Sequence, residues 1–159
     1  MIADPELADT ALWGHRTTDP VTVLIVNENP GVREAVTEIM ESDHTINVVG
    51  VAGRIAEAVS LAKLWEPEVA VLDVTMPDGS GWSAARRLRE VVPDIRLIAY
   101  ASFGEALITR MMMAAGVFAY IIKGSAAGLL LAVVDGDESP PLSRGDQVVA
   151  GRSTAGIAG

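Results

Sequence analysis

Residues 21–36, VTVLIVNENPGVREAV, give the clearest indication of the fold of this chain. The first six residues are β-branched and almost continuously apolar, as expected of a strand buried on both faces of a sheet. Asn29 and Pro30 then supply a helix N-cap and a first helical residue, and apolar residues recur at helical spacing from Val32 onward. The stretch therefore predicts a central strand that leads directly into a helix.

The strand-then-helix pattern recurs along the rest of the chain. Apolar runs predict strands at 46–51, 69–72, 95–100 and 117–122, and helical spacing predicts helices at 55–65, 82–92, 106–115 and 126–134. Strands that alternate with helices form parallel sheets, because right-handed crossovers place the helices on both faces. We predict a doubly wound α/β fold with a five-stranded parallel sheet, in the order 2-1-3-4-5, flanked by five helices.

The two ends of the chain differ in composition from this central part. Residues 1–20 are polar and show no sustained period, so we predict an N-terminal extension. Residues 21–135 form the predicted domain, and residues 136–159, rich in Gly, Ser, Pro and acids, are predicted to be a flexible tail. The tail is too short and too poor in helical periodicity for a helix-turn-helix, so no output domain is expected.

Charge and composition exclude several classes of protein. The chain has 159 residues and a net charge of −9, so it lacks the basic surface that direct binding to nucleic acid requires. It contains no cysteine, which rules out disulfides and zinc–thiolate sites. No apolar run is long enough to span a membrane, and the first residues do not resemble a secretory signal. We therefore expect a cytoplasmic protein.

Polar residues follow the predicted strands at one edge of the sheet. In open parallel sheets, ligands bind outside the carboxyl ends of the strands. The residues at these ends are Asn27, Glu28, Asp73, Ala101, Ser102 and Lys123. Two carboxylates from adjacent strands, with a backbone carbonyl and waters, are a sufficient set for Mg²⁺. With a metal and a lysine to neutralise charge, a carboxylate can also accept a phosphoryl group.

The order of these motifs resembles that of response-regulator receiver domains from bacterial two-component systems. VTVLIVNENPGVREAV is similar to their first strand, acidic turn and first helix. VAVLDVTMPDGSGW is similar to their phospho-acceptor segment, and GVFAYIIKG to their last strand with its lysine. The resemblance covers residues 21–134. It implies a signalling protein that works with a histidine kinase or with another regulator, and not an enzyme that turns over a substrate.

The resemblance also implies a role for individual residues. Asp73 matches the phosphorylated aspartate and Lys123 the lysine of the site. Glu28 matches the second acid of the pair that contacts Mg²⁺, and the carbonyl of Thr75 matches the backbone metal ligand. Tyr120 matches the aromatic switch position, whose side chain changes rotamer when a hydroxyl on the fourth strand moves towards the phosphoryl group.

Two positions depart from the pattern of this family. Asn27 stands where the first acid of the metal-binding pair is expected, which implies weakened Mg²⁺ binding. Ala101 stands at the Ser/Thr switch position and has no hydroxyl to bond a phosphoryl group. Ser102 would replace that hydroxyl only if a bulge or an early loop redirected it, because successive strand residues point to opposite faces. These departures predict an atypical receiver.

Each of these residues also has an ordinary structural interpretation. Asp73 could cap a turn before the Met-Pro loop, and Lys123 could be a solvent-facing lysine. Asn27 and Glu28 could form a polar turn that leads into the next helix, whose dipole stabilises nearby acids. The presence of Asp73, Glu28 and Lys123 at matching positions favours the phosphorylation site over these separate explanations.

Three functions follow from these observations. The first is an interaction module that binds a partner or itself as a homodimer or heterodimer, with phosphorylation impaired or dispensable. Its predicted surface comprises helix 106–115, strand 117–122 and helix 126–134, and the apolar residues that suggest it are Leu107, Met111, Val117 and Leu129 to Leu131. The second is a conventional Mg²⁺-dependent receiver that is phosphorylated on Asp73. The third, an enzyme or flavin carrier, is disfavoured because no Gly-rich phosphate loop follows the first strand.

Overall fold

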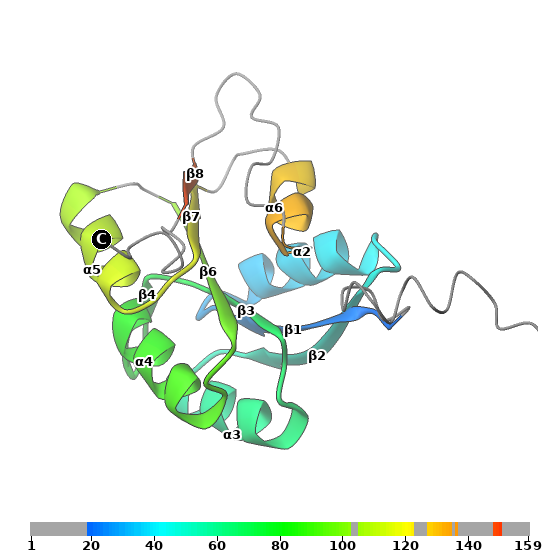
Figure 1. Cartoon of the computed structure of the whole chain (residues 1–159), viewed down its shortest axis with the longest axis horizontal. Coiled ribbons are helices and arrows are strands. Elements are labelled where there is room, and N and C mark those ends of the chain that lie inside the picture. Colours follow the sequence, from blue (N-terminus) through cyan, green and yellow to red (C-terminus); the bar gives the residue numbers. More distant parts are fainter. Residues whose placement is uncertain (1–18, 103–104, 123–126, 135, 137–147, 151–159) are drawn as a thin grey trace, which may run out of the picture.

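A twisted sheet with helices on both faces forms the centre of the computed structural model (Figure 1). The structure describes residues 19–102, 105–122, 127–134, 136 and 148–150. Five strands run parallel in the order β2-β1-β3-β6-β7, and their bounds are β1 (Val21–Val26), β2 (Ile46–Ala52), β3 (Val69–Leu72), β6 (Arg96–Ala101) and β7 (Ala119–Ile122). The predicted doubly wound parallel sheet and its strand order are confirmed.

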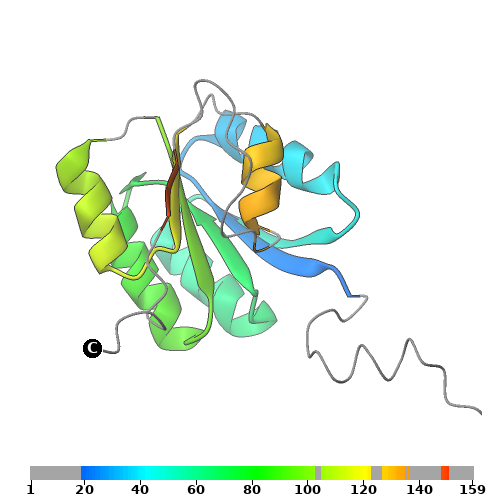
Figure 2. The ribbon, with the colours of Figure 1, turned by 45° about the horizontal axis from the view of Figure 1, so that its top comes forward.

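The helices divide between the two faces of the sheet. Helices α2 (Pro30–Glu41) and α6 (Ala127–Val134) cover one face, and helices α3 (Ile55–Trp65), α4 (Gly81–Val91) and α5 (Ala106–Ala114) cover the other (Figure 2). All four residues of β3 are buried, because helices lie above and below it. The apolar runs of β3 and of residues 23–26 in β1 therefore report burial on both faces, as predicted for β1. None of the helices in the described part of the chain is long and apolar enough to cross a membrane.

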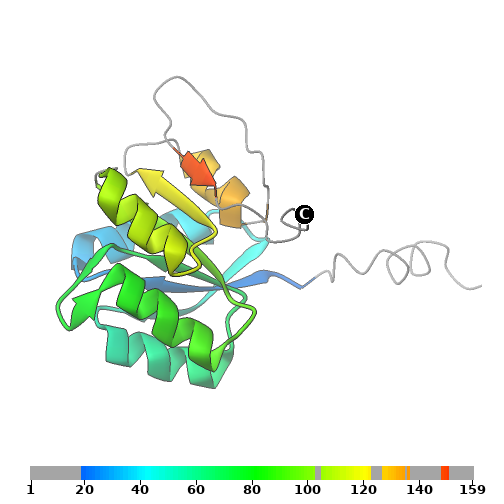
Figure 3. The same ribbon diagram turned by 60° about the vertical axis from the view of Figure 1, so that its left-hand side comes forward.

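A sixth strand, β8 (Val148–Ala150), corrects one prediction. These residues were expected in the flexible tail, but they pair antiparallel with β7 at the outer edge of the sheet (Figure 3). The run is only three residues long and is flanked by segments rich in Gly and polar residues, so its strand character is not visible in the local pattern. It arises because the edge of β7 offers backbone groups that need partners.

Two shorter strands form the loop that follows Asp73. Strands β4 (Thr75–Met76) and β5 (Gly79–Ser80) pair antiparallel, where the sequence predicted only a loop. Ser80 then caps α4 by accepting a hydrogen bond from the backbone N–H of Ser83, at 3.2 Å. The hairpin thus connects the end of β3 directly to the start of α4.

The first turn of α2 is closed by the predicted cap. The side-chain oxygen of Asn29 accepts hydrogen bonds from the backbone N–H groups of Gly31, at 2.9 Å, and of Val32, at 3.3 Å. Pro30 occupies the first helical position, where its missing N–H is not needed. The Asn-Pro signal in the sequence is therefore confirmed.

Helix α3 takes its cap from a distant residue. Arg54, the residue before the helix, makes no capping bond with its side chain. Instead, the carboxylate of Asp78 in the β4–β5 hairpin accepts hydrogen bonds from the N–H groups of Ile55, at 2.8 Å, and of Ala56, at 3.1 Å. This contact links the hairpin beside Asp73 to the start of α3. The hydrogen bond from Ile55 is the main reason that the pKa of Asp78 lies below its ordinary value.

We expect Asp78→Ala to lower the melting temperature at pH 7, because two N–H groups of α3 lose their acceptor. Because the pKa of Asp78 is lower in the folded protein than its ordinary value of 3.8, the ionised carboxylate stabilises the fold at pH values above 3.8. This contribution is lost as the pH falls through the pKa of the folded state. The difference in melting temperature between Asp78→Ala and the wild type should therefore become smaller below about pH 4. Circular dichroism melts between pH 7 and pH 3 measure it, with Asp94→Ala, at an exposed turn, as control. Equal melting temperatures at pH 7 would contradict the capping role.

Helix α6 is fastened to the sheet by an arginine of β6. The guanidinium of Arg96 donates a hydrogen bond to the carbonyl of Val134, at the last residue of α6. The same group lies 5.7 Å from the centre of the Phe118 ring. A cation near the last carbonyls of a helix is favourable because they form the negative end of its dipole. The contact fixes the position of α6 beside β6 and β7.

Candidate functional site

The candidate site lies at the carboxyl ends of β1 and β3. These strands are paired so that Val26 stands opposite Leu72, and the N–H of Asp73 donates a hydrogen bond to the carbonyl of Val26, at 3.0 Å. Asn27 and Asp73, which come next on each strand, are therefore neighbours. Asp73 is half-buried, and one oxygen of its carboxylate accepts a hydrogen bond from the N–H of Val74, at 2.8 Å. The structure brings together these two residues, which the sequence had placed 46 positions apart.

Asn27 is a buried residue that shapes the turn after β1. Its side chain is 3% exposed, and its oxygen accepts a hydrogen bond from the N–H of Asn29, at 2.9 Å. Its own N–H donates to the carbonyl of Ala52 in β2, at 3.0 Å. An amide suits this position because a buried carboxylate would need a compensating charge. The alternative interpretation of Asn27, as part of a turn that leads into the helix, is thus realised in the structure.

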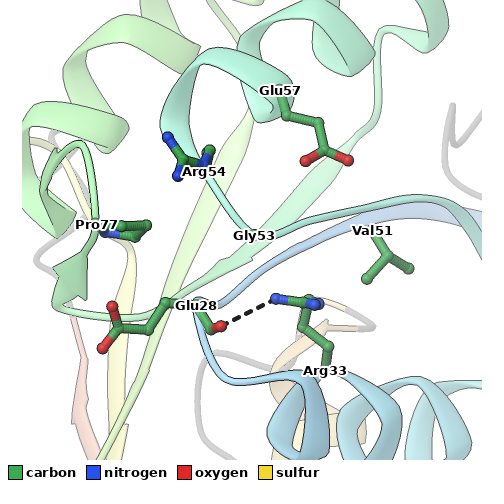
Figure 4. Close-up of a pocket in the computed structure, with 7 residues that line it drawn as sticks. All are labelled: Glu28, Arg33, Val51, Gly53, Arg54, Glu57 and Pro77. Carbon is green, nitrogen blue, oxygen red and sulfur yellow. Dashed lines mark hydrogen bonds between the residues drawn. The ribbon is translucent and has the colours of Figure 1, made fainter.

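Arg33 is a residue of this site that the sequence analysis missed. Its guanidinium donates hydrogen bonds to the carbonyl of Asn27, at 2.8 Å, and to the carbonyl of Glu28, at 3.1 Å (Figure 4). Arg33 lies in the first turn of α2, so it can reach back over the turn that precedes the helix. Its position, one helical turn after the capping asparagine, is the only signal in the sequence. It places a positive charge against the loop that was predicted to hold a cation.

A polar pocket opens beside this arginine. Figure 4 shows Glu28 extending away from Arg33, on the side of Pro77, while Arg54 and Glu57 lie across the pocket. Glu28 is exposed. The lining residues are Glu28, Arg33, Val51, Gly53, Arg54, Glu57 and Pro77. Charges of both signs meet here, so the pocket is not a purely acidic cation site.

The predicted Mg²⁺ ligands all lie among the residues that the structure describes. Among the described residues, no three acidic or histidine side chains come together in a way that could hold a metal ion. The ligands that the resemblance implies are the carboxylates of Asp73 and Glu28 and the carbonyl of Thr75, which begins β4. Mg²⁺ in proteins often uses one or two carboxylates and retains several waters, so this set is sufficient in kind. The amide of Asn27 adds no charge to it.

The residues at the predicted switch position differ sharply in exposure. Ala101, the last residue of β6, is completely buried, whereas Ser102 is exposed beyond the end of the strand.

Tyr120 in β7 is 1% exposed and packs in the core between the sheet and helices α3 to α5. The hydroxyl of Thr109 in α5 forms a hydrogen bond with Tyr120. Burial, and then the nearby charges of Asp73 and Glu105, raise the pKa of Tyr120, so its hydroxyl keeps its proton at neutral pH.

The structure corrects part of the predicted interaction surface. Val117 is 3% exposed and Leu130 is 1% exposed, so both belong to the core. Leu107 is 68% exposed, and Met111 and Leu131 are half-buried. The apolar run in α6 faces inward because this helix has to cover the sheet next to α2. Lys123 and the side chain of Leu129 lie outside the described residues.

Comparisons with known proteins decide the family. Residues 23–135 match the response regulator receiver domain. The chain belongs to this family. This receiver domain is 35% identical over 105 residues to the DNA-binding transcriptional activator DevR/DosR of Mycobacterium tuberculosis, a match that covers 65% of this chain and 48% of that protein. It is 30% identical over 105 residues to the response regulator GacA of Pseudomonas aeruginosa, covering 66% and 49%. The chain therefore spans about half the length of these curated relatives.

Solved structures agree with this assignment. The receiver domain of the putative response regulator NarL from Mycobacterium tuberculosis is 27% identical, with a TM-score of 0.68 over 74% of this chain and 98% of that one. The response regulator domain of Thermotoga maritima CheB is 25% identical, with a TM-score of 0.68 over 77% and 99%. The resemblance that the three sequence motifs suggested is confirmed, and with it a place in two-component signalling.

Proposed function

We propose that this chain is an atypical receiver domain that acts mainly through protein–protein interaction, with phosphorylation impaired or dispensable. The observation that carries the proposal is the fully buried methyl group of Ala101, at the position where a receiver needs a hydroxyl. A hydrogen bond to a charged group is worth about 1.5 to 3 kcal/mol. Its loss reduces the coupling between phosphorylation and conformation by about one to two orders of magnitude.

The surroundings of Asn27 support the same proposal. The amide replaces one negative charge next to Asp73, and Arg33 donates to the two carbonyls of the same turn. Both features make the site less attractive to a divalent cation. When bound, Mg²⁺ would be held by Asp73, Glu28 and the carbonyl of Thr75, and would neutralise charge on an incoming phosphoryl group. A weak metal site slows this transfer.

The proposed partner surface comprises α5, β7 and α6. Leu107 is a large exposed apolar residue on this surface, and Met111 and Leu131 contribute partly exposed area. The proposed partner is a histidine kinase, another regulator or a second copy of this chain, encountered in the cytoplasm. Although one relative is described as a DNA-binding activator, the net charge of −9 opposes direct binding of this chain to nucleic acid.

The alternative function is that of a conventional receiver. In this reaction a carboxylate oxygen of Asp73 forms a bond to phosphorus, and the donor leaves with the electrons of its broken P–O or P–N bond. Asp73 is half-buried at the end of β3, so a donor has access to it. The chain would then accept a phosphoryl group without being an enzyme with a separate substrate.

Intact mass spectrometry after incubation with a small phosphodonor separates the two functions. We expect at most a minor phosphoryl adduct on the wild type, with or without Mg²⁺, and none on Asp73→Asn. After the same incubation, we also expect the wild type and Asp73→Asn to have the same dissociation constant for self-association, measured by sedimentation equilibrium. A near-complete, Mg²⁺-dependent adduct that Asp73→Asn abolishes, together with altered self-association, would establish the conventional receiver instead.

A further inference from the structure

Strand β8 occupies the only edge of the described sheet next to the proposed partner surface. Its residues pair antiparallel with β7, with Ala119 opposite Ala150, Tyr120 opposite Val149 and Ile121 opposite Val148. The other side of β7 pairs with β6. Figures 1 and 3 show β8 beside β7 on the side of the molecule where α5 and α6 lie. The outer backbone groups of β7 therefore find their partners within the same chain.

Without β8, the outer edge of β7 would be an effective template for another strand. Its sequence, AYII over Ala119–Ile122, contains no charge and no proline, and is rich in residues that favour strands. Natural sheets usually protect such edges with charges, prolines, bulges or a covering segment. In this chain β8 is the covering segment. Protection thus depends on a strand of three residues, which contributes few pairings.

The direction of β8 indicates which strand would compete with it. Two identical strands related by a two-fold axis perpendicular to their sheet pair antiparallel. Strand β8 is also antiparallel to β7, so it occupies the edge in the orientation that the β7 of a second copy would adopt. We propose that Val148–Ala150 is an intramolecular cap that limits pairing between the β7 edges of two copies. The inference deepens the proposed function, since it assigns control of self-association to a segment beside α5 and α6.

A proline in β8 tests the cap within the full chain. Val149→Pro removes one N–H and restricts the backbone at the central residue of the strand. Val149→Thr is the matched control, because it keeps the branched shape and the N–H. We expect the dissociation constant for self-association, measured by sedimentation equilibrium, to fall at least tenfold in Val149→Pro and to remain near the wild-type value in Val149→Thr. A folded Val149→Pro chain with unchanged self-association would overturn the proposal.

A reversible disulfide provides a second test of the cap, and this test does not require the proline variant to fold. Ala119 and Ala150 are opposite each other, at a separation that a disulfide can bridge between paired strands, and the chain has no native cysteine. We expect the oxidised double variant Ala119→Cys/Ala150→Cys to migrate as a monomer on a non-reducing gel and to self-associate at least tenfold more weakly than after reduction. An intermolecular disulfide, or equal association in both states, would overturn the cap. The outcome of these association experiments does not change the outcome of the phosphodonor assay. The capping role of β8 and the proposed function can therefore fail separately.

Discussion

Gly81→Ala is expected to reduce the free energy of unfolding by about 3 kcal/mol, at the upper end of the usual range for overpacking. A Cβ atom at this position would lie 2.4 Å from the carbonyl oxygen of Asp73 and 2.7 Å from the Cα of Val74. Both are backbone atoms of the segment that carries the predicted phospho-acceptor, so they cannot move without displacing it. The gain in helix propensity from alanine, about 0.5 to 1 kcal/mol, is too small to offset this clash.

Urea unfolding measures this effect directly. Gly31→Ala is a suitable control, because Gly31 is exposed and its added Cβ would meet only the side-chain oxygen of Asn29, at 3.3 Å. We expect this control to stay within about 0.5 kcal/mol of wild type, as most surface substitutions do. If Gly81→Ala were as stable as the control, the start of α4 would not be packed against the backbone of Asp73.

Asn27→Asp is expected to make the stability of the domain depend on Mg²⁺. The new carboxylate would be buried next to Asp73, so we expect a loss of about 2 kcal/mol in the absence of metal from burial and like-charge repulsion. The same charge should lower the dissociation constant for Mg²⁺ by about tenfold, since it adds an attraction of about 1 kcal/mol or more for a divalent ion. Saturating Mg²⁺ should then restore most of the lost stability.

Thermal melts with and without about 10 mM Mg²⁺ measure the effect of the metal on the stability of Asn27→Asp. This concentration is of about the order needed to occupy a weak site. Sodium chloride at the same ionic strength is the control, because screening alone also relieves repulsion between acids. We expect a clear rise in melting temperature with Mg²⁺ for Asn27→Asp and a smaller rise for the wild type. An equal rise in both proteins would show that the amide of Asn27 does not limit metal binding.

These two variants act on the same few residues for different reasons. Gly81 allows the backbone of α4 to approach the backbone of Asp73, the predicted phospho-acceptor. Asn27 sets the charge beside it and is held by its hydrogen bond to the N–H of Asn29. A receiver domain that keeps the geometry of the site but loses charge and hydroxyl groups retains its fold and its surfaces. On this basis we propose an interaction module that does not depend on phosphorylation.

The order and direction of the five parallel strands could be predicted from the sequence. Strands buried on both faces appear as short apolar runs such as Val69–Leu72, and they alternate with helices of matching length. The N-cap of α2 could also be predicted, because Asn29 and Pro30 are adjacent and both act on the first turn of the same helix. The carboxyl ends of adjacent strands then had to bring Asn27 close to Asp73. All of these features depend on local backbone preferences and on the rule that parallel strands share an edge.

The contacts between segments distant along the chain became apparent only from the folded structure. Asp78 caps a helix that begins 23 residues earlier, which no local pattern indicates. The inward position of Val117 and Leu130 depends on which helix covers which part of the sheet. Strand β8 forms because β7 needs a partner at its edge, and not because Val148–Ala150 has a strong pattern of its own. Local periodicity specifies an element, whereas the partners of its polar groups are chosen only when the whole chain has packed.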